Sequence, residues 1–211
     1  MTTCDWRLTG SLGMATTTAG IGTWQWIKLT NFAGWQSVLR GNPAGDNSNS
    51  TFISGMKLSM RLDLLYAQKG AYLQVFLVSP AKDYADFDPS STPIDSMPRV
   101  FDDSSAYQTG KFNPEAVKVH KCWGINLTQT TMNGDVPTNG PFTPGIIFHR
   151  SYYKRLGWKV TSPIDRSWKD VDFDNLPYHQ QLWLVGQVVT GEPSSQYTMS
   201  VTARFTTKQY D

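Results

Sequence analysis

Cysteine is scarce in this chain of 211 residues. Cys4 and Cys122 are the only two, and they do not have the spacing of a metal site. Small secreted domains that depend on disulfides contain many more cysteines, so the sequence excludes that class. We expect two free thiols, and a single disulfide between them is the alternative.

Charge is also scarce. Asp, Glu, Lys and Arg make up 17 % of the residues, and the formal net charge is +2. So small a charge does not attract nucleic acid by itself, because phosphate binding requires clustered Lys and Arg side chains. The low charged fraction indicates a surface that largely contacts other protein, or else a neutral extracellular domain rich in Thr and Ser.

Long apolar runs are missing. No stretch of the sequence reaches the roughly 18 apolar residues that a membrane-spanning helix needs. The first residues, MTTCDWRLTGSLGMATTTAGIG, lack the basic start and apolar centre of a signal peptide. We therefore expect no membrane insertion.

Motifs for catalysis are missing as well. The sequence contains no Gly-x-Ser-x-Gly, no Gly-rich phosphate loop and no dinucleotide-binding fingerprint. His120, His149 and His179 are scattered without a second ligand at metal spacing, so we interpret them as structural histidines. Cys122 follows His120 by two residues, but a cysteine protease also needs an oxyanion hole and an activated thiolate. We expect no enzymatic activity, no catalytic residue and no cofactor.

One acidic segment resembles the start of a calcium loop. Asp170, Asp172 and Asp174 alternate along it, but the Gly and the distal Glu of such a loop are absent. We expect a solvated acidic loop and no metal site. A cation shared between subunits is the alternative.

What the sequence does contain is strand periodicity, seen best in residues 51–80. Apolar and polar residues alternate strictly through its first half, which predicts a strand with one buried and one solvated face. The apolar positions are Met56, Leu58, Met60, Leu62 and Leu64. After a break at Gly70, residues 71–78 are apolar on both faces, which predicts a second, largely covered antiparallel strand.

Further strands are predicted at residues 21–31, 116–128, 146–161, 182–190 and 196–208. The last two are joined by a five-residue turn and should form a hairpin. Long loops separate the others, and no amphipathic helix exceeds two turns. The pattern predicts an all-β fold, a single jelly-roll sandwich of two antiparallel four-stranded sheets with long loops. We place a flexible N-terminal arm at residues 1–20 and the jelly-roll domain at residues 21–211.

Basic residues next to aromatic ones are the main functional signal. Lys57 and Arg61 lie on a predicted wet face, and a second group surrounds Tyr152 and Tyr153. The second group contains His149, Arg150, Lys154 and Arg155. Cations beside rings suit single-stranded nucleic acid, although a solvated strand face is the alternative. The candidate nucleic-acid-binding residues are Lys28, Arg204 and Lys208, which we place on neighbouring first and last strands.

The order of the segments resembles the capsid proteins of small circular single-stranded DNA viruses, the circovirus-like group, and more distantly those of satellite necrosis viruses. The similarity extends over about residues 20–210. It is carried by Gly55-Met56-Lys57-Leu58, by Val75–Asp83, by Phe112-Asn113-Pro114 leading to Trp123, and by Tyr197–Phe205.

This resemblance implies a structural protein that self-assembles into a small icosahedral shell around a circular single-stranded DNA genome. It implies location in the virion, assembly in the host nucleus and room for a host cell-surface receptor, with Lys28, Arg204 and Lys208 facing inward. Such capsids usually begin with a long Arg-rich arm, whereas this chain begins MTTCDWR. Either that arm was removed or packaging differs.

Two other functions are weighed against the capsid. A jelly-roll carbohydrate-binding module would use loop Trp and Asp residues to hold sugar and calcium. A glycoside hydrolase would need two carboxylates facing each other across a cleft, and no pair in the sequence can be placed that way.

Overall fold

The computed structural model describes residues 2–16, 22, 24–30, 50–64, 71–81, 100, 111–127, 145–161, 178–190 and 196–209. The first four strands are β1 (Thr2–Ala15), β2 (Gln25–Lys28), β3 (Ser50–Leu64) and β4 (Ala71–Pro80). The remaining elements are β5 (Val117–Leu127), β6 (Gly145–Thr161), the short 3-10 helix η3 (Tyr178–Gln180), β7 (Trp183–Thr190) and β8 (Gln196–Gln209). No helix within these ranges is long and apolar enough to cross a membrane.

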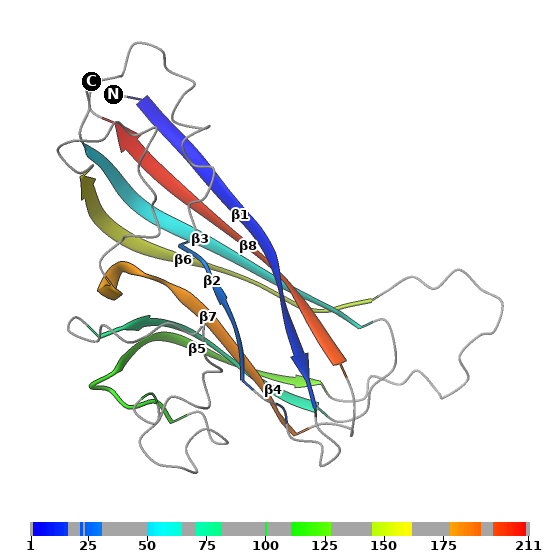
Figure 1. Ribbon diagram of the computed structural model, residues 1–211. Coiled ribbons are helices and arrows are strands. Elements are labelled where there is room, and N and C mark those ends of the chain that lie inside the picture. Colours follow the sequence, from blue (N-terminus) through cyan, green and yellow to red (C-terminus); the bar gives the residue numbers. More distant parts are fainter. Residues whose placement is uncertain are drawn as a thin grey trace.

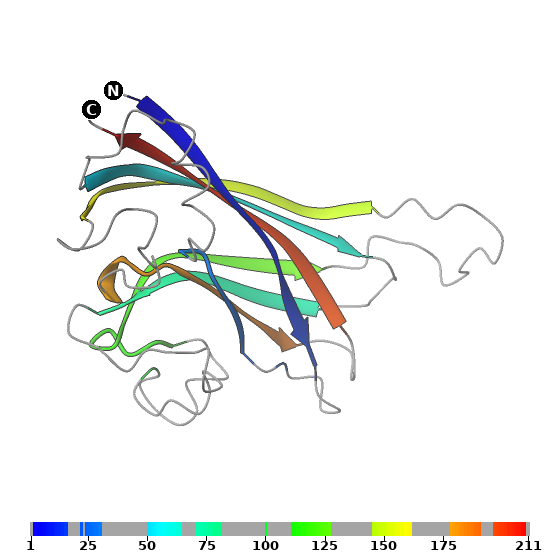
Figure 2. The same ribbon diagram turned by 45° about the horizontal axis from the view of Figure 1, so that its top comes forward.

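The eight strands form two four-stranded antiparallel sheets that pack face to face (Figures 1 and 2). The strand order is β1-β8-β3-β6 in the first sheet and β2-β7-β4-β5 in the second. An N-terminal strand pairs with a C-terminal strand in each sheet, β1 with β8 and β2 with β7, as in a jelly roll. The predicted fold class is confirmed.

The main core lies between the two sheets, and the apolar side chains that alternate along β3 and β8 point into it. The side chains of Met56, Leu58, Met60 and Leu62 are all fully buried. They meet the buried alternate residues of β8, which are Tyr197, Met199, Val201, Ala203 and Phe205. Because the side-chain period of a strand is two, the residues between them face outward.

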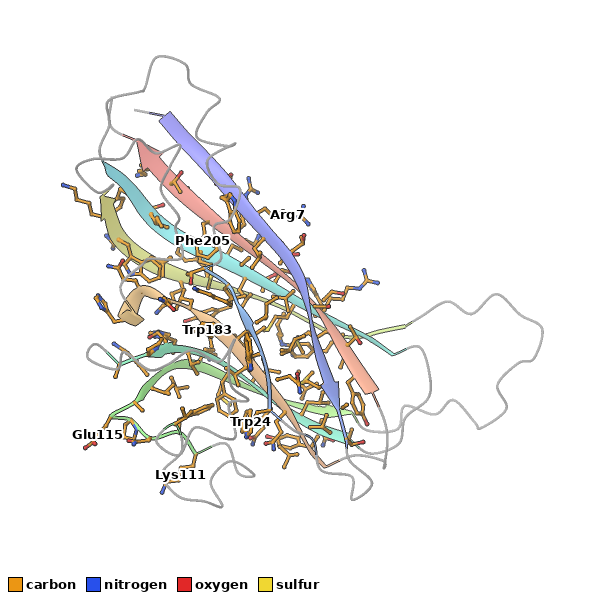
Figure 3. All side chains as sticks on the ribbon, viewed as in Figure 1. Arg7, Trp24, Lys111, Glu115, Trp183 and Phe205 are labelled. Atoms are coloured by element: carbon orange, nitrogen blue, oxygen red, sulfur yellow. The ribbon has the colours of Figure 1, made fainter. Side chains whose placement is uncertain are left out.

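A second apolar cluster covers the outer face of the second sheet. Phe76 of β4 and Trp183 of β7 point away from the main core and pack with Trp24 and Phe112. Ring centroids of Phe76 and Phe112 lie 5.1 Å apart. In Figure 3 Trp24 and Trp183 lie at this sheet, and Lys111 marks the segment beyond it. The prediction that residues 71–78 are covered on both faces is confirmed.

The predicted flexible arm is wrong for residues 2–15, which form β1. This strand pairs antiparallel with β8 along its whole length, from Thr2 opposite Gln209 to Ala15 opposite Gln196. Trp6, Leu12 and Met14 alternate inward and are buried. Of the small and polar residues that suggested a loose arm, Thr9, Ser11 and Gly13 occupy outward positions between the inward ones, so composition concealed the alternation.

A shorter strand than expected forms within residues 21–31. β2 covers four residues, although backbone bonds fix the chain to β7 on both sides of it. The Gly22 amide donates to the Val188 carbonyl at 2.8 Å, and the Leu29 amide donates to the Leu182 carbonyl at 2.8 Å. β2 is therefore the second strand of the fold and an edge of the second sheet.

Candidate nucleic-acid interface

The outward side chains of β1, β8, β3 and β6 form a four-stranded surface that we call the outer basic face. Its residues align across the strands in three rows, set by the pairing register. The first row is Arg7, Arg204, Lys57 and Tyr153; the second is Thr9, Thr202, Ser59 and Ser151; the third is Ser11, Ser200, Arg61 and His149. Successive rows lie about 7 Å apart, since each is two residues further along the strands.

Charge on this face is unbalanced. Arg7, Arg204 and Lys57 are exposed and directly opposite one another on adjacent strands. Like charges at directly opposite positions destabilise a sheet, so this row favours an anionic partner. Asp5 is the one carboxylate among the described outward side chains of this face; it forms an ion pair with Arg204 and accepts a 3.0 Å hydrogen bond from Thr206 Oγ1.

The face also carries an exposed ring. Tyr153 is 63 % exposed and lies over the backbone of β3 at Gly55. A Cβ atom at position 55 would lie 2.7 Å from Tyr153 Cζ, so any side chain there would displace the tyrosine ring. Tyr153 therefore presents a solvent-accessible ring on this face.

These groups have the chemistry of a nucleic-acid backbone site. Guanidinium, ammonium and hydroxyl groups donate hydrogen bonds to phosphate oxygens without reading sequence, and an exposed ring can stack on an unpaired base. A row of hydroxyls between two rows that contain cations therefore suits a single strand lying across the sheet.

Of the three predicted site residues, the structure brings two together. Arg204 and Lys208 lie on β8 in the first sheet, whereas Lys28 lies on β2 in the second. The Lys28 ammonium is 5.6 Å from the centroid of the Trp183 ring, on the opposite outer face of the sandwich. The first and last strands are neighbours, as predicted, but the first strand is β1, so the prediction that Lys28 lies on it was wrong.

Arg7 is the residue of this face that the sequence interpretation missed. In Figure 3 it lies on β1 and points away from the second sheet, while Phe205 lies between the sheets. The alternation of Asp5, Arg7 and Thr9 with Trp6 and Leu8 could have identified its strand and its outward orientation.

The basic group around Tyr152 and Tyr153 is divided between two surfaces. His149 faces outward, and its Nε2 atom is 3.3 Å from Ser59 Oγ. Tyr152 instead faces the second sheet, where its ring meets Trp123 edge-on with centroids 5.6 Å apart. Lys154 also faces that way and contacts His120.

The remaining candidate chemistry is limited. Cys122 is a free thiol, as predicted, and partial burial raises its pKa although Lys121 acts in the opposite direction. A raised pKa disfavours the thiolate that a nucleophile needs. Among the described residues, no three His, Cys, Asp or Glu side chains are grouped to hold a metal ion. Asp170, Asp172 and Asp174 lie outside the described residues.

No protein-family model and no curated protein matches the chain. Similar solved structures include mud crab tombus-like virus (12 % identity, TM-score 0.43), with coverage of 100 % of this chain and 83 % of that one. The BFDV capsid protein 60-mer is also similar (10 %, TM-score 0.38, coverage 99 % and 94 %). A third is the Macrobrachium rosenbergii nodavirus (10 %, TM-score 0.38, coverage 99 % and 58 %). At these identities, no residue role is transferred from them.

Proposed function

We propose that this protein is a viral capsid subunit that assembles with identical copies into a small icosahedral shell around a circular single-stranded DNA genome. The outer basic face carries the proposal. Its cations and hydroxyls fit a phosphate backbone, and its excess of positive charge lowers the stability of an isolated subunit. The order of segments that resembles circovirus-like capsids supports the same function.

Self-association has its own physical support. β6 is 17 residues long and is an edge strand of its sheet. Among the described residues, no further strand pairs with its outer side. Long edge strands readily pair with other chains unless they are covered. The low charged fraction, 17 %, suits extensive subunit contacts. Closed symmetry lets each copy bury such surfaces at once.

In this proposal the outer basic face lines the interior of the shell, with Arg204 and Lys208 among its genome contacts. Lys28 lies on the opposite face of the sandwich and would point elsewhere in the same shell. The virion is then the protein's location, and assembly in the host nucleus and a cell-surface receptor are further parts of the proposal.

Electron microscopy and light scattering of the full 211-residue chain test the shell. We expect closed particles of uniform diameter that contain nucleic acid, and digestion with strand-specific nucleases after disassembly should identify single-stranded DNA. A monomer at every salt and protein concentration would contradict the proposal. Retention on a glycan array that a chelator abolishes would favour the carbohydrate-binding alternative.

A further inference from the structure

A cleft of about 720 Å³ opens where the edge strands β5 and β6 of the two sheets face each other. The end of β4 and η3, the orange helical turn in Figure 1, also border it. Its described lining includes Ser79, Phe112, Lys118, His120, Lys154 and Trp158. The cleft is separate from the outer basic face, because Lys154 extends from β6 toward the second sheet.

The charge of this cleft is of one sign. Lys118, His120, Lys154, Arg155 and His179 are basic, and none of the described residues that line the cleft is Asp or Glu. Basic groups converge here from β5, from β6 and from η3, which are far apart in the sequence. Cations gathered in a concave, partly desolvated site raise the local concentration of anions.

His120 is held in a defined orientation at the centre of the cluster. Its Nδ1 atom is 3.2 Å from Lys154 Nζ, and its Nε2 atom is 2.9 Å from Ser79 Oγ. An ammonium only donates, so Nδ1 accepts from Lys154 and the Nε2–H donates to Ser79. The Lys154 ammonium has three N–H donors, and this contact uses one of them.

Burial and the crowding of basic groups in this cleft lower the pKa values of His120 and Lys154. Burial, and then the charges of Lys154 and Lys118, lower the pKa of His120 to about 4. Burial, and then Lys118, lower the pKa of Lys154. A bound anion among these groups would oppose the lowering of both pKa values by the lysine charges.

We propose that this cleft binds a phosphate group carried by a molecule of nucleotide size. Lys118 and Lys154 donate to the phosphate oxygens, and His120 sets the position of the Lys154 ammonium. The volume far exceeds that of one oxyanion and lies within the range of small-molecule sites. The half-buried Trp158, with Phe112 and Pro114, supplies an apolar wall for a sugar or base. This site does not depend on the proposed shell or on its genome contacts.

Titration calorimetry of the full chain with adenosine monophosphate tests the proposal, with adenosine and inorganic phosphate as separate probes. We expect the nucleotide to bind at least tenfold more tightly than either part. Lys154→Gln and Lys118→Gln should each weaken nucleotide binding by about tenfold or more, as charge-assisted hydrogen bonds are lost. The matched control is Lys121→Gln, an exposed lysine of β5 outside the cleft lining, which should leave binding unchanged.

Several outcomes would overturn this proposal. Absence of nucleotide binding at millimolar concentration would contradict it directly. If Lys121→Gln and Lys154→Gln weaken nucleotide binding equally, binding is general charge attraction and the cleft is not a specific site. If inorganic phosphate binds as tightly as the nucleotide, the cleft does not recognise a ligand of nucleotide size. Lys118 is exposed, so the Lys118→Gln variant should fold. Its nucleotide binding tests the proposal if the Lys154→Gln variant does not fold. Particle formation is scored independently, so failure of the shell leaves this test intact.

Discussion

His120 connects the chemistry of the cleft to the stability of the fold. Its ring contacts Ser79 of β4 and Lys154 of β6, and the charge of Lys118 of β5 also acts on it. Arg155 of β6 and His179 of η3 line the same cleft. The sequence could not identify this role, because His120 and His179 are nearly sixty residues apart and only the sandwich brings both to one cleft. The contact of His120 with Ser79 agrees with the expectation that the histidines are structural. That expectation did not include a cleft lined by His120 and His179.

We expect acid to destabilise the subunit through His120. Its pKa is about 4 in the folded protein and 6.5 in the unfolded chain, so the unfolded state binds more protons between these values. This stability contribution is complete above pH 6.5 and falls as the pH decreases toward 4. We expect a loss of about 1 kcal/mol, less than the full shift implies because the cleft is open to solvent.

Denaturant unfolding of dissociated subunits at pH 7 and pH 4.5 measures this effect. His120→Gln should lose less stability between the two pH values than the unmodified chain. His149→Gln, on the outer basic face, should lose as much as the unmodified chain. Equal losses in all three proteins would exclude His120 as the cause.

At the scale of elements, β1 is the strand that sequence composition concealed. It packs across β7 because Gly186 leaves room for it: a Cβ atom there would lie 2.8 Å from Leu12 Cδ2 and 2.9 Å from Met14 Sδ. A side chain at the inward-facing Gly10 of β1 would similarly collide with Ile27 of β2. Small residues on both sheets thus allow this end of the sandwich to close.

Gly186→Ala should therefore destabilise the fold by about 1–3 kcal/mol, because overpacking a dense core forces neighbouring side chains from their positions. The matched control is Gly13→Ala on the outward side of β1, where a Cβ atom meets nothing within 4 Å. That change should have little effect or a slightly stabilising one. Thermal unfolding followed by circular dichroism compares the two. Equal melting temperatures would contradict the packing of β1 on β7.

For the whole molecule, the two outer faces of the sandwich differ in character. The second sheet is covered by the aromatic cluster around Trp24 and Phe112, whereas the first presents cations, hydroxyls and Tyr153. A single-stranded nucleic acid should therefore bind one side of the subunit. The salt dependence of binding reports how many phosphates that side neutralises.

The double variant Arg7→Gln with Lys57→Gln should weaken binding of a single-stranded oligonucleotide of mixed sequence. It should also reduce the slope of log affinity against log salt by about 1.4, since each lost phosphate contact contributes about 0.7. The control is Lys111→Gln, an exposed lysine on the segment that covers the second sheet. Fluorescence anisotropy over a range of salt concentrations gives both quantities.

Lys28→Gln, measured in the same way, tests the residue predicted from the sequence on the opposite face. An unchanged slope would place the interface on the first sheet alone. A decrease equal to that of one outer-face lysine would contradict the assignment to a single face.

The sequence by itself determined the strands whose alternation is strong. Met56 to Leu62 and Tyr197 to Phe205 have a period of two that only a half-buried strand satisfies, and the run from Ala71 to Val78 required cover on both faces. Those local patterns were sufficient for an all-β sandwich. They also identified Arg204, Lys57 and Arg61 as outward-facing.

Only the tertiary structure decided which strands are neighbours. Pairing between β1 and β8 joins the two ends of the chain, and local periodicity contains no information about contacts so distant in sequence. That pairing places Arg7 beside Arg204, and Lys28 lies apart from both on β2 of the other sheet. The packing of the two sheets brings Lys154 of β6 to His120 of β5. The charged surfaces of this protein therefore follow from strand order, which the packing of the whole sandwich fixes.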